Sequence, residues 1–145
     1  MANEHNWTGL TTAAEAIATA SLNSIANGSG ALGADIGPHD DFSVRMELYL
    51  STINLSSQDN PAVYIYFVLS DDDGSTFEDG GAAVEPAKMP DLIFPLRTVS
   101  GAQRVMIDAR FPPENFKVLL FNHSGVTFNA SGNTLYYSPF TTETN

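Results

Sequence analysis

The stretch that decides the fold is "DFSVRMELYLS", residues 41–51, in which apolar and polar side chains alternate. The apolar positions on one side are Phe42, Val44, Met46, Leu48 and Leu50. Side chains of a β-strand point alternately to opposite faces of its sheet, so a period of two over ten residues predicts a strand with one buried face.

Further strands follow from the same reasoning. Alternation recurs in "QRVMIDARF" (103–111), and "FKVLLFN" (116–122) and "NTLYYSPF" (133–140) are also predicted strands. "AVYIYFVLS" (62–70) is apolar on both sides, which favours a central strand. "DLIFPLRTVS" (91–100) contains Pro95, which cannot donate to a ladder, so we place it at a sheet edge. With turn clusters between them, these runs predict an all-β, single-domain jelly roll or β-sandwich of about eight strands.

The N-terminal part is predicted to be an arm, with residues 1–16 outside a sandwich domain of residues 17–145. Residues 12–27 fit a helix, because Thr12 and Glu15 have capping-box spacing, or a strand rich in Thr, Ser and Ile. The glycine-rich "ANGSGALGADIGP" (26–38) predicts a loop or flexible arm.

Composition narrows the function classes. The chain has 145 residues, no cysteine and a net charge of −11, with only six Lys and Arg. Such an acidic chain repels phosphate backbones, so we expect no nucleic-acid partner. No segment approaches the roughly 20 apolar residues of a membrane span, and "MANEHNWTGLTT" lacks the features of a signal peptide. We therefore expect a soluble protein that is made without secretion and has no membrane partner.

The acidic stretch "SDDDGSTFEDGG" (70–81) invites comparison with a calcium loop. Counted from Asp71, Gly74 falls at position 4 and Ala82 at position 12, whereas the helix–loop–helix calcium site needs Gly at 6 and Glu at 12. An irregular site in which Asp71, Asp73, Glu78 and Asp79 converge is the alternative. We predict a charged turn with a short strand around Phe77, and no metal.

Catalytic motifs are missing from the sequence. His5, His39 and His123 lie far apart, and no G-x-S-x-G elbow or phosphate-binding glycine loop with a following lysine is present. We expect no enzyme activity, no catalytic residues and no cofactor. Tyr64 and Tyr66 share a strand face, with Tyr136 near the end of another strand. This permits a sugar-stacking row or ordinary cross-strand packing.

Three stretches together resemble small structural proteins of tailed bacteriophages that are thought to decorate the capsid. They are "SLNSIANGSGALGADI" (21–36), "VYIYFVLSDDDGSTFEDG" (63–80) and "FKVLLFNHSGVTFNASGNTLYYSPF" (116–140). The family features are an S-L-N-S-L-A-N-G-like lead, S-x-D-G-x-x-Y/F-x-D, and A-S-G-N-x-L. They correspond to Ser21–Gly28, Ser70–Asp79 and Ala130–Leu135, and the extra aspartate in "DDDG" departs from the pattern.

This resemblance implies a jelly roll or related sandwich on the capsid surface, often as a trimer. The partner would be the major capsid protein, and the virion would be the final location after synthesis in the host cytoplasm. The alternatives are a tail or baseplate component and a carbohydrate-binding module.

A strongly acidic subunit packed on a shell needs a less acidic contact face, because exposed charges interact over about 8 Å at physiological salt. The candidate capsid or subunit contacts are Trp7, Arg97, Arg104, Arg110 and Lys117. Arg104 and Arg110 fall on the same side of one alternating strand, and tryptophan and arginine are favoured at interface hot spots. The alternative is that these cations form exposed ion pairs within the domain.

Overall fold

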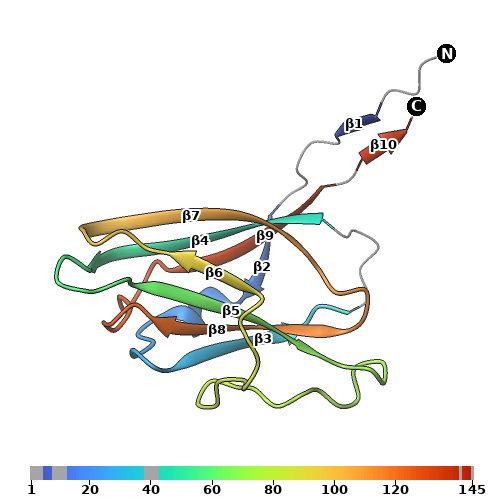
Figure 1. The fold of residues 1–145 in the computed structure, drawn as a ribbon, viewed down its shortest axis with the longest axis horizontal. Coiled ribbons are helices and arrows are strands. Elements are labelled where there is room, and N and C mark those ends of the chain that lie inside the picture. Colours follow the sequence, from blue (N-terminus) through green and yellow to red (C-terminus); the bar gives the residue numbers. More distant parts are fainter. Residues whose placement is uncertain (1–4, 8–12, 38–42, 141, 145) are drawn as a thin grey trace.

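The computed structural model describes residues 5–7, 13–37, 43–140 and 142–144. Within these ranges the chain forms ten strands and one 3₁₀ helix, η1 (Figure 1). In chain order these are β1 His5–Trp7, β2 Ala14–Ile17, η1 Thr19–Leu22, β3 Gly30–Asp35, β4 Ser43–Asn54, β5 Ala62–Leu69, β6 Leu92–Pro95, β7 Ser100–Arg110, β8 Phe116–His123, β9 Thr134–Phe140 and β10 Thr142–Thr144.

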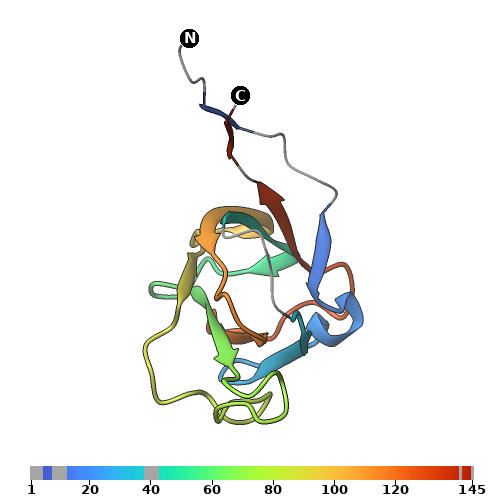
Figure 2. The same cartoon turned by 90° about the vertical axis from the view of Figure 1, so that its right-hand side faces the viewer.

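The strands form one long hairpin that is folded over into two layers. β5 pairs with β6, β4 with β7, β3 with β8 and β2 with β9, all antiparallel. Pairing of β4 with β9 and of β5 with β8 then joins these pairs into two sheets, β2-β9-β4-β7 and β3-β8-β5-β6. This is the strand order of a jelly roll, and it confirms the predicted eight-stranded sandwich. β1 pairs with β10 and continues the hairpin as a ribbon that leaves the body (Figures 1 and 2).

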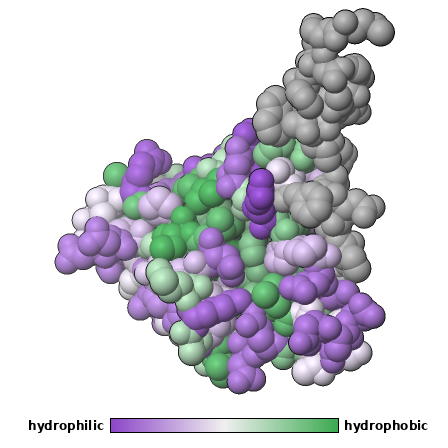
Figure 3. Space-filling model, turned by 45° about the vertical axis from the view of Figure 1, so that its right-hand side comes forward, coloured by the Kyte–Doolittle hydropathy of each residue, from purple (hydrophilic) through white to green (hydrophobic). Residues whose placement is uncertain are grey.

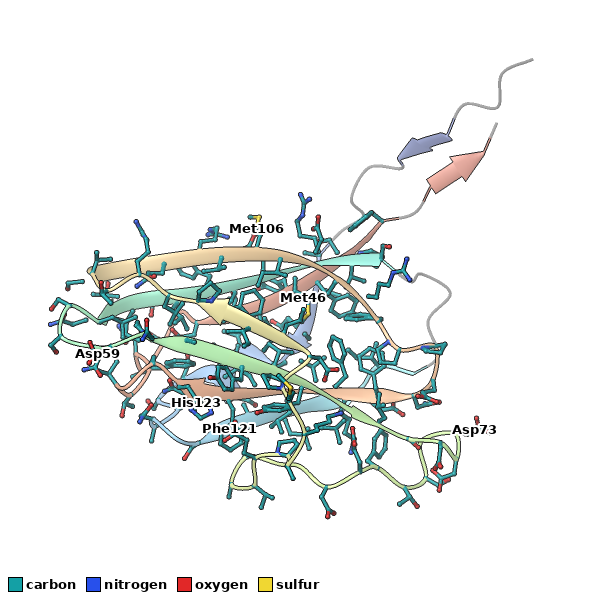
Figure 4. All side chains as sticks on the ribbon, in the orientation of Figure 1. Met46, Asp59, Asp73, Met106, Phe121 and His123 are labelled. Atoms are coloured by element: carbon teal, nitrogen blue, oxygen red, sulfur yellow. The ribbon has the colours of Figure 1, made fainter. Side chains whose placement is uncertain are left out.

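The core lies between the sheets and includes the alternating positions predicted for β4, except for Phe42, which lies outside the described residues. Val44, Met46, Leu48 and Leu50 of β4 are buried, and Met46 points between the layers (Figure 4). Burying one such side chain contributes about 1.5–3 kcal/mol. β5 is a central strand and β6, which contains Pro95, is an edge strand, both as predicted.

The glycine-rich segment is not the predicted loop, since its residues Gly30–Asp35 form β3. A Cβ on Gly30 would lie 2.4 Å from the Leu120 carbonyl oxygen, and one on Gly33 would lie 2.3 Å from that of Ala16. Glycine is needed here because the backbones approach too closely for a side chain. The glycines that led to the prediction of a loop are therefore the residues that let this strand pack closely against its neighbours.

The N-terminal alternatives are settled in favour of a strand followed by a short helix. β2 covers Ala14–Ile17 and η1 covers Thr19–Leu22. Ala16 and Ile17 are both buried in the core. The predicted boundary between residues 16 and 17 falls inside β2, so the position of the boundary stays a prediction.

The two sheets differ in what covers their outer sides. The excursion between β5 and β6, residues 70–91, lies over the β3-β8-β5-β6 sheet, where Tyr66, Val68, Leu119 and Phe121 form a second buried cluster. We call this outer side the covered face. No strand forms around Phe77, contrary to the prediction, but the ring packs against this cluster. We call the outer side of the β2-β9-β4-β7 sheet the open face, because no described segment lies over it in this way.

Candidate interaction surface

The open face presents the polar half of each alternating strand. Its side chains are Glu15 from β2; Arg45, Glu47 and Tyr49 from β4; Arg104, Met106, Asp108 and Arg110 from β7; and Tyr136 and Ser138 from β9. Register places Arg45 opposite Asp108, and Tyr49 opposite Arg104. Across β4 and β7, one arginine therefore faces a carboxylate and another faces an aromatic ring.

Ion pairs tie this surface together. The Arg45 guanidinium donates to both carboxylate oxygens of Asp108, with Nε to Oδ1 at 2.7 Å and Nη2 to Oδ2 at 3.2 Å. The Arg45 hydrogen bond holds the pKa of Asp108 below its ordinary value. Arg104 pairs with Glu47, and its guanidinium carbon lies 4.7 Å from the Tyr49 ring centroid. Ion pairs this exposed to water stabilise a fold only weakly, so they order the surface more than they stabilise the protein.

A shallow hollow of about 270 Å³ opens on this face. It is lined by Ala13, Arg45, Glu47, Met106, Tyr136 and Ser138. Met106 is 52% exposed and points away from the body above β7 (Figure 4). An apolar side chain beside paired charges is a feature of protein contact surfaces, where methionine and arginine are enriched.

The predicted contact residues do not all share this surface. Arg104 and Arg110 lie on the open face as expected, and Arg104 also makes the alternative intra-domain ion pair. Lys117 lies on the covered face, where its ammonium sits 4.2 Å from the Phe77 ring centroid. Arg97 lies between β6 and β7, and Trp7 is in β1, with its side chain outside the described part. The idea that Lys117 joins Arg104 and Arg110 on one basic face is therefore wrong, because β8 belongs to the other sheet.

Arg45 also belongs to this surface, although it was not among the contact residues predicted from the sequence. The alternation within residues 41–51 places Arg45 on the polar side of its strand. Its position beside Asp108 depends on the pairing of β4 with β7, which the sequence does not show. The three arginines of the open face balance its three carboxylates, Glu15, Glu47 and Asp108. The face is therefore close to neutral on a chain of net charge −11.

A second polar cluster lies on the covered face. The Tyr66 hydroxyl donates to Glu85 Oε1 at 2.7 Å, and His123 Nε2 lies 2.7 Å from the same oxygen. Burial would raise the pKa of Glu85, but the bonds from Tyr66 and His123 outweigh it and leave that pKa below its ordinary value. Burial and Glu85 raise the pKa of the Tyr66 hydroxyl. This cluster anchors the 70–91 excursion to the sheet.

The tyrosines do not form the sugar-stacking row considered from sequence. Tyr66 is only 2% exposed beneath the excursion, and the Tyr64 ring packs against His123 with centroids 4.3 Å apart. Tyr136 belongs to β9 in the other sheet. The cross-strand packing alternative holds for Tyr64 and Tyr66, because the excursion occupies the face that a sugar would need.

The acidic stretch forms a tight turn. The Asp72 carboxylate accepts from the Thr76 N–H at 2.7 Å and from the Ser70 hydroxyl at 2.8 Å, and these bonds lower its pKa. Asp73 and Gly74 have left-handed backbone angles, φ 56° and 83°. This confirms the predicted turn. Within the described ranges, no group of three or more His, Cys, Asp or Glu is placed to hold a metal ion.

Two of the family-like motifs meet at one end of the sandwich. The buried Asn133, in the stretch 130–135, donates to the carbonyl of Leu22 and to the side chain of Asn23, both in the stretch 21–28. The Phe128 N–H also donates to the Ile25 carbonyl at 3.0 Å. The two motifs therefore form hydrogen-bonded turns that hold neighbouring loops together, which accounts for their composition.

The chain matches no family model, and no curated protein matches it. Among solved structures, it is similar to the K1 cleaved adhesin domain of Lys-gingipain (Kgp) from Porphyromonas gingivalis W83, with a TM-score of 0.39 and 9% identity. The alignment covers 100% of this chain and 99% of that chain. At this TM-score the similarity carries no functional inference. Within the described ranges, none of the helical structure is long and apolar enough to span a bilayer.

Proposed function

We propose that the protein is a non-catalytic binding domain that acts through the open face. More particularly, it is a phage decoration protein that binds the outside of the major capsid protein lattice and stabilises the head. The observation that carries this proposal is the asymmetry of the sandwich: one outer face is covered by the 70–91 excursion, while the other is near neutral and holds an exposed methionine.

The physical reason is electrostatic. Many copies of a chain with net charge −11 must lie close together on a shell. Repulsion is smallest where positive charge is concentrated, and Arg45, Arg104 and Arg110 place half of the six cations on the open face. The choice of a capsid as partner rests on the sequence resemblance, which is an analogy and not a property of the surface.

The test is binding to undecorated capsids as the salt concentration is varied. In one variant, Arg104→Ser/Arg110→Ser, two open-face cations are removed. In its matched control, Arg97→Ser/Lys117→Ser, the same charge is removed elsewhere. A third variant lacks residues 1–8. We expect the open-face variant to bind least and to show the weakest salt dependence, while the control retains more of the parent's binding.

Other outcomes separate the remaining possibilities. If the open-face variant binds like the parent at every salt concentration, the open face is not the docking surface. If only the deletion weakens binding, the N-terminal segment carries attachment. Cryo-electron microscopy of intact particles that placed the protein on tails would replace the capsid proposal with a tail or baseplate role.

A further inference from the structure

The long edge strand β7 is open on one side. It spans 11 residues and pairs only with β4 in the described structure. Beyond the end of β6, by contrast, side chains cap the backbone of the exposed β5 edge. There Asp91 accepts from the Phe67 N–H at 2.7 Å, Lys88 donates to the Phe67 carbonyl at 2.6 Å, and Glu78 accepts from the Leu69 N–H at 2.9 Å. An uncapped edge offers its backbone groups to another strand.

The opposite side of the sandwich is closed. There β3 approaches β2 so tightly that a Cβ on Gly33 would lie 2.3 Å from the Ala16 carbonyl oxygen. On the β6–β7 side, by contrast, Val105, Ile107 and Ala109 point toward the core but remain only half-buried. The sandwich is therefore sealed along one edge and open along the other.

Exposed apolar side chains occur on or next to both strands that border the open edge, with Ile93 on the outer side of one sheet and Met106 on the open face of the other. Ile93 in β6 is 47% exposed, Val99 just before β7 is 40% exposed, and Met106 in β7 is 52% exposed. In the space-filling view, a hydrophobic patch lies on the side of the body that carries β6 and β7 (Figure 3). Concentrated apolar exposure of this kind marks an interaction site.

The sequence of β7 is complementary to itself about Met106. In an antiparallel pair of β7 strands centred on Met106, Arg104 of one copy lies opposite Asp108 of the other, and Val105 lies opposite Ile107. A two-fold axis perpendicular to the sheet keeps the charged side chains of both copies on the open face and the apolar ones toward the core. In this register, each residue lies opposite a residue whose side chain points to the same face of the sheet.

We propose that a second copy of this chain pairs with β7 in this register. The two β2-β9-β4-β7 sheets then join into one continuous sheet whose open faces are coplanar. The ion pairs within each chain then form a continuous row across the join. The Arg45–Asp108 pair of one copy lies next to the Arg104–Glu47 pair of the other. Charge complementarity favours a second copy of this chain as the partner. Two acidic chains can approach each other at β7 because positive and negative side chains face each other across the join. The proposal does not depend on the capsid role, and it differs from the trimer that the family resemblance implies.

The first test measures solution mass and uses charge reversal. Sedimentation equilibrium of the full chain should give twice the 15.6 kDa of one chain. Arg104→Asp places two carboxylates opposite each other across the join, and Asp108→Arg places two guanidinium groups there, so each variant alone should be monomeric. An equimolar mixture of the two variants restores opposite charges across the join and should form a heterodimer. Each variant also loses one ion pair within its own chain, and mixing does not restore that pair.

The second test fixes the register. The chain has no cysteine, so Met106→Cys carries a single thiol, which lies opposite its own counterpart at the two-fold axis. Mild oxidation should convert it to a covalent dimer. The control, Arg110→Cys, lies on the same exposed face but opposite Ala102 of the second copy, and should not cross-link. A monomer at all concentrations, a trimer, failure of the mixture to dimerise, or equal cross-linking of both cysteine variants would overturn the proposal.

Discussion

At the residue scale, Asn133 holds one end of the sandwich together. Its buried amide accepts from the Ser51 N–H at 3.1 Å and donates to the carbonyls of Asn129 and Leu22 at 2.8 and 3.4 Å. Asn133→Ala removes the partner of the buried Leu22 carbonyl and of two partly buried groups, and a buried group left unsatisfied costs about 1–3 kcal/mol. Urea unfolding should show a loss in this range. The exposed Asn129→Ala should change stability by no more than about 0.5 kcal/mol, and an equal loss in both would contradict the prediction.

Glu85 should make stability depend on pH in the acid range. Its folded-state pKa is lowered, so its contribution is complete above the ordinary value of 4.5 and is lost as the pH falls through the folded-state value. The difference in unfolding free energy between the parent and Glu85→Gln should therefore be larger at pH 6 than at pH 3. Urea unfolding at both values measures it. A Glu85→Gln difference that does not shrink in acid would refute the role of the bridge.

At the scale of elements, the strands with one buried face were predictable and β3 was not. β4 and β7 alternate large apolar and polar side chains, so burial is visible in their sequences. In β3 the glycines and alanines have too little side chain to show the pattern, although Leu120 and Ala16 lie against them. The same limit applies to the surface. Alternation placed Arg104 and Arg110 together, but no local signal gives the β4–β7 register that brings in Arg45, or the excursion that brings Glu85 to Tyr66 and His123.

The close approach of β3 to β2 gives a matched pair of glycine substitutions. Gly33→Ala places a Cβ 2.3 Å from the Ala16 carbonyl oxygen, so backbone must move. Overpacking of this kind costs about 1–3 kcal/mol. A Cβ on Gly81 meets nothing within 4 Å, so Gly81→Ala should change the unfolding free energy by no more than about 0.5 kcal/mol. Thermal or urea unfolding compares the two, and equal effects would show that β3 can move away from β2 at no cost.

At the scale of the whole molecule, the hairpin topology determines which terminal residues matter for folding. Its outermost pair, β1 and β10, forms a ribbon outside the two sheets, whereas the next pair, β2 and β9, belongs to the sandwich. Deleting residues 1–12 removes β1 and leaves β2 whole. Deleting residues 1–16 also removes most of β2 and makes β9 an edge strand.

The two deletions should therefore differ sharply. Deleting 1–12 should change the unfolding free energy by less than about 0.5 kcal/mol, since no described core residue is lost. Deleting 1–16 also removes the buried Ala16 and leaves Ile17 as a chain end without a strand to hold it. Full burial of a side chain such as Ile17 contributes about 1.5–3 kcal/mol, so a loss of at least this size is expected. Both deletions remove Trp7, the single tryptophan, so unfolding is followed by circular dichroism. Equal stability would mean that the domain begins at residue 17, as the sequence alone suggested, and that β2 contributes nothing to the sandwich.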